Sequence, residues 1–388
     1  MNLKKNKKLR LLIISHVIHY EKNGHFYAYT PYQKEIDIWA EIFSEILIAS
    51  PLKMAEPPSD CDYFRRKNIR ILPILERGGQ SIFDKFRLVL SIPKISLQLI
   101  QCIRQVDAIH VRCPGNLGLM GIILSPFFKR IRVAKYAGQW QGYPGESFTV
   151  KLQRWLLKSK WWNAPVLVYG EWPNQPAHII SFFTSILSNE NIGLAKESAL
   201  LKKIHNPIRI LYVGRLSQAK NVDTVLKSVR NLLTEGIKTE TKIIGQGDQL
   251  DFLQKLTGDL LIKDNLEFLG GLGFEEVLTY YQWADILVLV SETEGWPKAI
   301  TEAMAFGIVC IGSNRGLVPQ ILSEGRGIVI EPGDYYQLAN EIRKLSADVE
   351  AYKSMSRSSA EWSQKYSISS LKRELQELLM REWQIDFN

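Results

Sequence analysis

The chain has 388 residues, of which 46% are hydrophobic and 23% are charged, so a disordered or fibrous chain is excluded and two domains are expected. Its net charge of +9 is unevenly divided. Residues 1–205 contain 29 of the 49 basic and 15 of the 40 acidic side chains, a net charge of +14, and residues 206–388 have a net charge of −5, which indicates two parts with different partners.

The first half alternates short apolar runs with amphipathic stretches. The run 11–15 follows a basic tail and is too short for a signal peptide, so we predict a buried first strand and then a long loop over 17–31. Strand–helix alternation favours a parallel sheet with helices on both faces. Further strands are expected at 46–49, 69–74, 108–111, 132–136 and 166–169, and helices at 32–43, 82–104, 117–128 and 150–158.

The alternating pattern restarts after residue 207 and predicts a second α/β unit. We therefore expect a boundary near residue 205, with domains at 1–205 and 206–368 and a last segment at 369–388. Strands are expected at 208–213, 241–244, 266–269, 286–290, 309–312 and 327–330, with helices at 222–235, 249–257, 274–284 and 299–306 and a wholly helical stretch over 334–383.

Two cations follow the first strand of the second half. Gly214 permits a tight turn there, and Arg215 and Lys220 then lie at the carboxyl end of the strand, where open α/β sheets bind ligands. Two cations near a helix N-terminus suit a diphosphate, and a solvated loop with ordinary surface charges is the alternative. After the next strand, Gly245 and Gly247 would let the backbone approach a phosphate or base closely, unless they serve only a structural turn.

Two glutamates follow the strand at 286–290. Glu294 lies in the loop, and Glu302 lies on a helix that Pro297 would start. One carboxylate can face the sugar side of a pocket, and the other can accept hydrogen bonds from both hydroxyls of a ribose. Gly295 leaves room for backbone amides to meet a substrate. Simple solvent exposure of both glutamates is the alternative.

The motifs described above are followed by Gly316–Gln320. Taken in their order along residues 208–334, they resemble the nucleotide-sugar half of family-4 glycosyltransferases. These group 1 glycosyl transferases are retaining enzymes of the GT-B fold. The resemblance implies an α/β chain with two Rossmann-like parallel-sheet domains that face each other across a cleft. It also implies that the C-terminal helix, 369–388, crosses back to the N-terminal domain. The first half resembles the family in architecture only.

The resemblance also implies roles for these residues. Arg215 and Lys220 would neutralise the diphosphate of a UDP- or GDP-linked sugar, so neither a metal ion nor a cofactor would be needed. Glu302 would bind the ribose, and Glu294 would hold the donor sugar. The implied donor-binding set also includes Gly214, Gly245, Gly247, Gly295, Trp296, Pro297 and Lys298.

The sequence departs from the family pattern in three places. Leu317 and Gln320 stand where the family has a glycine and a glutamate. The family's glycine-rich turn after the first strand has no clear counterpart, so His16 and Gly24 are the candidates there. The family's histidine after the strand at 132–136 is missing, and Gln139 is the candidate to bind the donor sugar in its place.

Cations and aromatic residues alternate at 151–162 and at 83–90 in the basic half. This mixture suits an anionic membrane surface, where lipid-linked acceptors would be reached, although buried tryptophans beside solvated lysines are the alternative. No nucleic-acid-binding motif accompanies the positive charge, so a nucleic-acid partner is not expected. The four cysteines lack paired spacing, and no apolar run could span a membrane, which favours a reducing, cytoplasmic location, peripheral at most to a membrane.

The expected function is therefore retaining, metal-independent transfer of a hexose from a nucleotide sugar to a glycan or lipid-linked acceptor, in polysaccharide or glycolipid synthesis. Two alternatives remain open. One is a nucleotide-sugar epimerase of the same architecture. The other is a non-catalytic partner subunit that keeps the fold and binds the nucleotide sugar.

Overall fold

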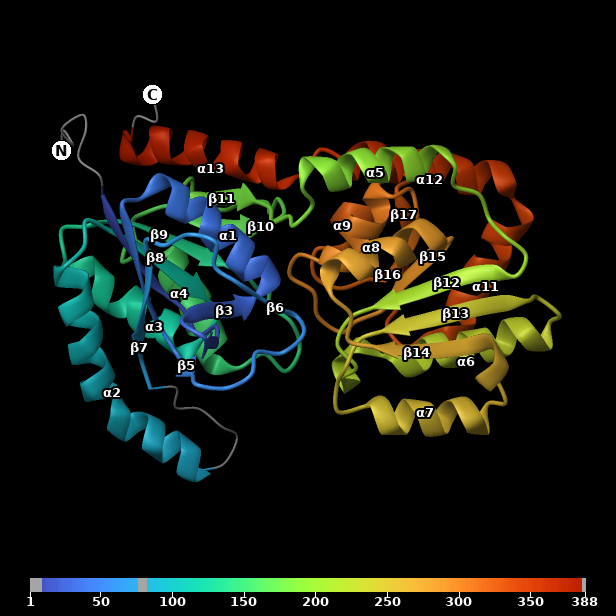
Figure 1. The fold of residues 1–388 in the computed structure, drawn as a ribbon, viewed down its shortest axis with the longest axis horizontal. Helices are drawn as coiled ribbons and strands as arrows, with labels where there is room; N and C mark the ends of the chain where they lie inside the picture. The colour runs from blue at the N-terminus through green and yellow to red at the C-terminus, as the bar shows by residue number, and fades with distance from the viewer. Residues whose placement is uncertain (1–8, 76–81, 386–388) are drawn as a thin grey trace. The chain divides into compact units, whose positions relative to one another are not determined.

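The computed structural model describes residues 9–75 and 82–385, with the side chains of 82–89 left out. The chain divides into two compact α/β units (Figure 1). Unit 1 consists of Met1–Thr184 and Leu371–Asn388, and unit 2 consists of Ser185–Ser370. Unit 2 begins about 20 residues before the predicted boundary at residue 205, because helix α5 (Asn189–Leu200) packs against α9 and α12 of unit 2.

Unit 1 is built on a seven-stranded parallel sheet; the alternation predicted a parallel sheet and six of these strands, but not β11 (Ile179–Phe182). Its strands lie in the order β11-β10-β9-β8-β1-β4-β7. The central strand, β1, is buried from Leu11 to Ile14, which explains its unbroken apolar run. The strands are β1 (Arg10–Ile14), β4 (Glu45–Ser50), β7 (Ile69–Pro73), β8 (Ala108–Cys113), β9 (Ile131–Tyr136), β10 (Val166–Tyr169) and β11 (Ile179–Phe182), and the helices are α1 (Thr30–Ile42), α2 (Ile82–Arg104), α3 (Asn116–Leu124) with the 3₁₀ turn η1 (Ser125–Phe127), and α4 (Phe148–Lys158).

A small second sheet replaces the predicted loop over 17–31, so that prediction is wrong. Its strands lie in the order β5-β2-β3-β6 and comprise β5 (Leu52–Lys53), β2 (His19–Lys22), β3 (His25–Tyr29) and β6 (Cys61–Tyr63). Between β2 and β3, Asn23 and Gly24 have φ values of 52° and 75°. Two consecutive positive φ values are what a two-residue hairpin turn requires, and Asn-Gly is the pair that adopts them most readily.

Unit 2 contains a six-stranded parallel sheet in the order β14-β13-β12-β15-β16-β17. Helix α6 illustrates how its helices cover the sheet, because its valines and leucines recur every three or four residues and are buried. The strands are β12 (Ile208–Val213), β13 (Thr239–Ile244), β14 (Leu266–Gly270), β15 (Ile286–Leu289), β16 (Val309–Ser313) and β17 (Gly327–Ile330), and the helices are α6 (Val222–Thr234), α7 (Leu250–Asp259), α8 (Phe274–Trp283), α9 (Lys298–Ala305) and α10 (Val318–Leu322), with 3₁₀ turns η2 (Gln218–Lys220) and η3 (Lys263–Asn265).

The predicted helical stretch over 334–383 consists of three helices: α11 (Tyr335–Ala347), α12 (Val349–Ser363) and α13 (Ile368–Trp383). The side chains of Asp334 and Asp348 accept hydrogen bonds from backbone N–H groups in the first turns of α11 and α12, so each aspartate starts a new helix. From Leu371 onward α13 belongs to unit 1, where the Trp383 ring lies against Trp39 and Phe43.

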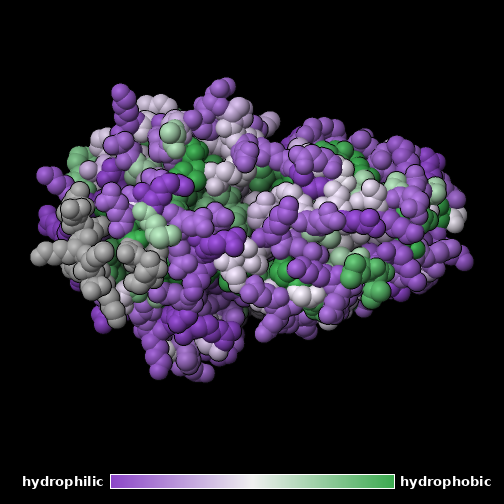
Figure 2. All heavy atoms as spheres, turned by 90° about the horizontal axis from the view of Figure 1, so that it is seen from above, coloured by the Kyte–Doolittle hydropathy of each residue, from purple (hydrophilic) through white to green (hydrophobic). Residues whose placement is uncertain are grey.

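Hydrophilic residues cover most of the face drawn in Figure 2. Among the described residues, no helix is both long enough and apolar enough to cross a membrane. All four cysteines are free.

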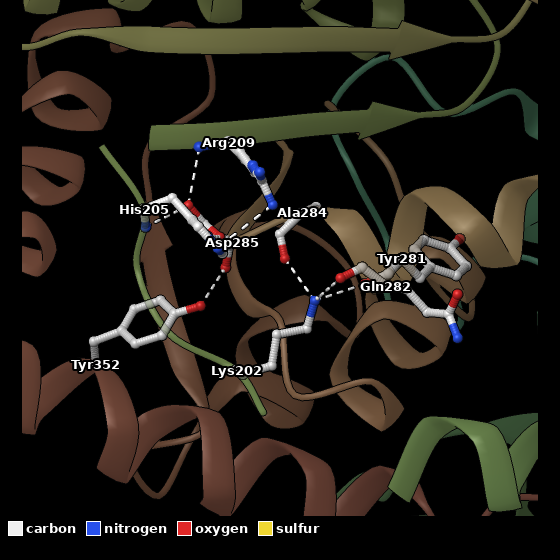
Figure 3. Close-up of polar contacts among 8 residues, drawn as sticks. All are labelled: Lys202, His205, Arg209, Tyr281, Gln282, Ala284, Asp285 and Tyr352. Carbon is white, nitrogen blue, oxygen red and sulfur yellow. Dashed lines mark hydrogen bonds and ion pairs between the residues drawn. The ribbon is translucent and has the colours of Figure 1, made fainter. Parts of the chain in front are cut away.

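Hydrogen bonds from Lys202 connect the segment that precedes β12 to the C-terminal end of α8. Its Nζ donates to the backbone carbonyl oxygens of Tyr281, Gln282 and Ala284 at distances of 2.7–2.8 Å (Figure 3). These carbonyl groups end a helix and have no partner within it, so a cation satisfies them both by hydrogen bonding and by charge. Burial lowers the pKa of Lys202 to about 8.

Asp285, which directly precedes β15, fastens the same segment at a second point. Its fully buried carboxylate accepts hydrogen bonds from the backbone N–H of His205 at 2.9 Å, from the backbone N–H of Arg209 at 3.0 Å and from the His205 Nδ1 at 2.6 Å (Figure 3). The Tyr352 hydroxyl donates to the Asp285 backbone carbonyl at 3.0 Å. Residues 202–209 are therefore an integral part of unit 2.

We expect Asp285→Ala to destabilise unit 2, because it leaves three donors without their acceptor. A hydrogen bond to a charged group contributes about 1.5–3 kcal/mol, so the free energy of unfolding should fall by at least that amount. Thermal unfolding followed by circular dichroism measures the loss. Asp264→Ala, at an exposed carboxylate, is the control and should change little. Equal melting temperatures for the two variants would contradict this account.

Unit 1 buries a charged group and two neutral imidazoles beneath its sheets. The Glu35 carboxylate pairs with the Lys135 ammonium at 2.9 Å and the Arg112 guanidinium at 3.4 Å. Burial would raise the pKa of Glu35, but the charges of Lys135 and Arg112 outweigh it and lower the pKa. Burial lowers the pKa of His110 to about 3 and that of His19 to about 4. The His110 ring stacks on Trp39, as a core histidine would.

These groups predict that unit 1 loses stability in acid. Below pH 6.5 the unfolded chain takes up protons on His110 and His19, whereas the folded chain does not until pH 3–4. The free energy of unfolding should therefore fall by about 1.4 kcal/mol per pH unit for each histidine as the pH drops through this window. Urea unfolding at pH 7, 6, 5 and 4, followed by tryptophan fluorescence, measures how the free energy of unfolding changes with pH. His110→Leu should reduce this change, whereas His25→Ala, at an exposed position, should leave it as in the wild type; the same pH dependence in both variants would contradict the prediction.

Candidate active site

The candidate residues of unit 2 meet at one edge of its sheet. Arg215 follows β12, Gly245 and Gly247 follow β13, and Glu294 follows β15. These three strands are neighbours and parallel, so their carboxyl ends lie at the same edge. This is the edge at which open α/β sheets bind ligands. The structure thus brings together the motifs that the sequence analysis singled out separately.

The two charged motifs are joined by an ion pair. Lys220 Nζ donates to Glu294 Oε1 at 2.6 Å, and both side chains are largely buried. Asn221, at a φ of 48°, connects the same loops, because its side chain donates to the Val290 carbonyl at 3.1 Å and to Glu292 Oε1 at 2.8 Å. The sequence predicted Lys220 and Glu294 as site residues but not as a pair, since 74 residues separate them.

Arg215 presents a further cation in the same segment after β12, five residues before Lys220. Its side chain is exposed and makes no ion pair with the described residues. Its position is fixed through the backbone, because the Tyr212 hydroxyl donates to the Arg215 carbonyl at 2.9 Å. Burial raises the pKa of Tyr212, and the negative charge of Glu294 raises it further, so the hydroxyl stays a donor. This role of Tyr212 was not predicted from the sequence, because an aromatic residue inside a buried strand is expected to be part of the hydrophobic core.

Gly245 and Gly247 allow a close approach, and the approaching group is the backbone of the loop that carries Arg215. A Cβ at Gly245 would lie 1.8 Å from the Gly214 carbonyl oxygen, and one at Gly247 would lie 2.0 Å from the Leu216 carbonyl oxygen. Backbone hydrogen bonds join the two loops, including Leu216 N–H to the Gln246 carbonyl at 2.9 Å. The two glycines therefore allow the loop that carries Arg215 to lie directly against the turn that follows β13.

Glu302 lies on α9 with its side chain mostly buried. The Tyr281 hydroxyl, from α8, donates to Glu302 Oε2 at 2.9 Å. This contact fixes the direction of the carboxylate. Tyr281 is a second residue that sequence reasoning missed, because the turn-by-turn pattern of α8 shows only that it is buried.

The segment Gly295–Lys298 connects the two glutamates. Trp296 is 8% exposed; its indole Nε1 donates to Thr301 Oγ1 at 3.2 Å, and its ring packs on Tyr366. The Trp296 side chain is thus engaged in packing, which leaves its backbone as the part available to a ligand. Pro297 is the residue before α9 rather than its first residue, and α9 begins at Lys298.

The three candidates of unit 1 have different surroundings. His16 follows β1, and its ring lies against Gly115, where a Cβ would be 2.6 Å from His16 Nδ1. Gly24 lies in the β2–β3 turn, where its positive φ serves the hairpin, so the expected glycine-rich turn after β1 is not there. Gln139 follows β9, and its Oε1 is buried without a hydrogen-bond donor among the described residues. In those same residues, no group of three or more His, Cys, Asp or Glu side chains could hold a metal ion.

The fold and the residues at the carboxyl edge of the unit 2 sheet can now be compared with known protein families. Residues 196–362 match the family described as glycosyl transferases group 1. Unit 2 is therefore a group 1 glycosyltransferase domain, and the two parallel-sheet units have the GT-B fold.

Particular relatives support this assignment. The chain is 30% identical over 195 residues to the amylovoran biosynthesis glycosyltransferase AmsK of Erwinia amylovora, covering 48% of this chain and 46% of that protein. It is 27% identical over 172 residues to the N-acetyl-alpha-D-glucosaminyl L-malate synthase of Bacillus anthracis, covering 43% and 44%. These matches span about half the length of the curated relatives.

Solved structures match over nearly the whole chain. Sucrose-phosphate synthase of Thermosynechococcus elongatus superimposes with a TM-score of 0.68 at 16% identity, covering 97% of this chain and 99% of that one. Anabaena HepE in complex with UDP-glucose gives a TM-score of 0.68 at 14% identity, covering 96% and 100%. At such identities the likeness establishes the fold, including that of unit 1.

Proposed function

We propose that the chain is a retaining family-4 glycosyltransferase that moves a hexose from a UDP- or GDP-linked donor to a glycan or lipid-linked acceptor. The observation that carries the proposal is the Lys220–Glu294 ion pair at the same edge of the sheet as the exposed cation of Arg215. Two cations and a carboxylate at the carboxyl edge of a nucleotide-binding sheet suit the diphosphate and the sugar of one donor. The names of the relatives, amylovoran biosynthesis and GDP-mannose-dependent mannosyltransferase, support a polymer or lipid product.

In this proposal the protein stabilises the leaving group by charge. Arg215 and Lys220 offset the negative charge that develops on the diphosphate as the glycosidic bond breaks, so no metal ion or cofactor is required. Glu302, held by Tyr281, accepts from the ribose hydroxyls, and Glu294 accepts from the donor sugar. The acceptor attacks from the face that the diphosphate leaves, and a diphosphate oxygen takes the acceptor proton.

Unit 1 supplies the acceptor side in this proposal. On the donor side, the buried Oε1 of Gln139 has no hydrogen-bond donor among the described residues and would accept from a hydroxyl of the donor sugar; His16 lies at the same edge of the sheet. Free cysteines throughout the chain fit a reducing, cytoplasmic compartment. The acceptor would then be reached in solution or at the inner face of a membrane.

A donor screen tests the proposed function. One class of UDP- or GDP-sugar should raise the melting temperature and be slowly hydrolysed, with EDTA having no effect and the released sugar keeping the anomeric configuration of the donor. Binding without turnover in the presence of candidate acceptors would support the non-catalytic subunit. Release of a sugar inverted at C2 would support the epimerase, and inversion at the anomeric carbon would contradict retention.

A further inference from the structure

Unit 1 exposes large aromatic side chains along α4 and beside its end. Phe148 and Trp155 are 77% and 64% exposed, and Phe127 and Trp161 are 70% and 39% exposed. Phe148 and Trp155 lie seven residues apart on α4, which places them on the same side of the helix, two turns apart. These four residues are called the aromatic face below. A folded chain rarely leaves this much aromatic surface in water without a partner.

Contacts between α3 and α4 hold this face together. The Gly115 N–H, just before α3, donates to Gln153 Oε1 of α4 at 3.1 Å. Just after α4, the Trp161 indole donates to the carbonyl of Ile122 in the last turn of α3 at 3.0 Å. The Phe127 and Trp161 rings are 5.3 Å apart, edge to face. The tryptophan is therefore held with part of its ring in solvent, and a packing defect does not explain its exposure.

Positive charge surrounds the aromatic face. Residues 108–170 contain nine lysines and arginines but a single acidic residue, Glu146, which is buried and paired with Arg154. Four lysines of this stretch are exposed and make no ion pair with described residues: Lys129, Lys151, Lys158 and Lys160. No carboxylate of the described residues neutralises their charge, which can meet an anionic partner; the Lys158 Nζ also lies 5.2 Å from the centroid of the Trp140 ring.

We propose that the aromatic face and its four lysines dock on an anionic lipid bilayer. Aromatic rings with lysines beside them suit the headgroup region, where the rings enter the apolar boundary and the ammonium groups meet lipid phosphates. A second copy of the same face would oppose lysines to lysines, and a neutral surface would leave their charge unused. The proposal rests on the proposed function only in that a docked enzyme would meet a lipid-linked acceptor.

Sedimentation of the full chain with vesicles tests the docking. We expect binding to vesicles of phosphatidylglycerol mixed with phosphatidylcholine, weak binding to phosphatidylcholine alone, and a loss of binding between 0.1 M and 1 M salt, where the screening length falls from about 10 to 3 Å. The tryptophan fluorescence of the chain should shift to the blue on binding, and the shift should be smaller in Trp155→Phe. Equal binding to both vesicle types, or binding that salt does not weaken, would overturn the proposal.

Matched variants locate the surface. Phe148→Ala combined with Trp155→Ala should lower partitioning at least about tenfold. Lys151→Glu combined with Lys160→Glu should lower it at least about 25-fold, since each lysine near an anionic surface contributes about fivefold. Phe252→Ala combined with Tyr336→Ala removes comparably exposed rings of unit 2 and should have no effect. Wild-type partitioning of either unit 1 variant would overturn the proposal.

Two further measurements separate the alternatives. If soluble dextran sulfate binds as tightly as the anionic vesicles and depends on the same residues, the partner is a polyanionic glycan and the proposal falls. Donor hydrolysis without vesicles should be unchanged in all these variants. If the wild-type chain hydrolyses donor but does not sediment with vesicles, the docking is wrong and the proposed function stands; the reverse result would contradict the proposed function alone.

Discussion

Arg215→Ala should lower the rate of donor turnover by about 10²–10³-fold while leaving the fold intact. The expected loss is large because the guanidinium would act on charge that develops only as the diphosphate leaves. The fold should be preserved because the side chain is exposed and forms no ion pair with the described residues. The backbone anchor of the loop, from the Tyr212 hydroxyl to the Arg215 carbonyl, does not depend on the side chain.

The measurement is steady-state hydrolysis or transfer with the donor found in the screen, together with a melting curve. Arg343→Ala is the matched control, since Arg343 is an exposed arginine of unit 2 on α11, away from the sheet edge, and its turnover should be that of the wild type. Lys220→Ala is a less clean test, because it also leaves the Glu294 carboxylate without its cation. Wild-type turnover of Arg215→Ala would remove the central support for the proposed function.

Gly247→Ala and Gly245→Ala should each destabilise unit 2 and weaken nucleotide binding. Each added methyl group would overlap a backbone carbonyl oxygen, which cannot rotate out of the way as a side chain can. Overpacking of this kind costs about 1–3 kcal/mol or more, and the loop that carries Arg215 would have to move to relieve it. We therefore expect a lower melting temperature and a weaker affinity for UDP or GDP in the same variant.

Gly193→Ala is the matched control for these two substitutions. Gly193 lies in α5 of unit 2, and a Cβ there would meet nothing within 4 Å. Alanine in a helix interior is favoured over glycine by up to about 1 kcal/mol, so this variant should melt at the same temperature or higher. The account of the two loops would be wrong if Gly247→Ala melted and bound nucleotide as Gly193→Ala does.

The central parallel strands were predictable because both of their faces are buried, which produces unbroken apolar runs such as 11–14 and 286–289. The hairpin of β2 and β3 was missed although its Asn23-Gly24 pair is a strong turn signal, since its strands carry histidines, lysines and tyrosines rather than an apolar run. The boundary was misplaced because the sequence of α5 does not reveal which unit it packs against.

The site was predictable where it depends on charges that follow strands, as at Arg215 and Glu294. It was not predictable where a contact joins distant parts of the chain. The Tyr281–Glu302 hydrogen bond joins two helices, and the hydrogen bond from Asn221 to the Val290 carbonyl, just after β15, spans 69 residues. The close approach at Gly245 also joins distant parts of the chain. From the sequence it was attributed to a phosphate or base, whereas in the structure the carbonyl oxygen of Gly214 occupies the space that a Cβ would need.

Unit 2 is inserted into unit 1, and this arrangement fixes the order in which the cores can be completed during translation. The two ends of unit 2 are already bonded to each other, since the Ser185 hydroxyl donates to the Tyr366 carbonyl and the Ile368 N–H donates to the Leu187 carbonyl, each at 2.8 Å. Unit 1 needs Trp383 against Trp39, and this residue leaves the ribosome after all of unit 2. Unit 1, whose first part is synthesised before unit 2, therefore completes its core after unit 2. Trp39 and Phe43 lack their contact with Trp383 while some 340 residues are added to the chain.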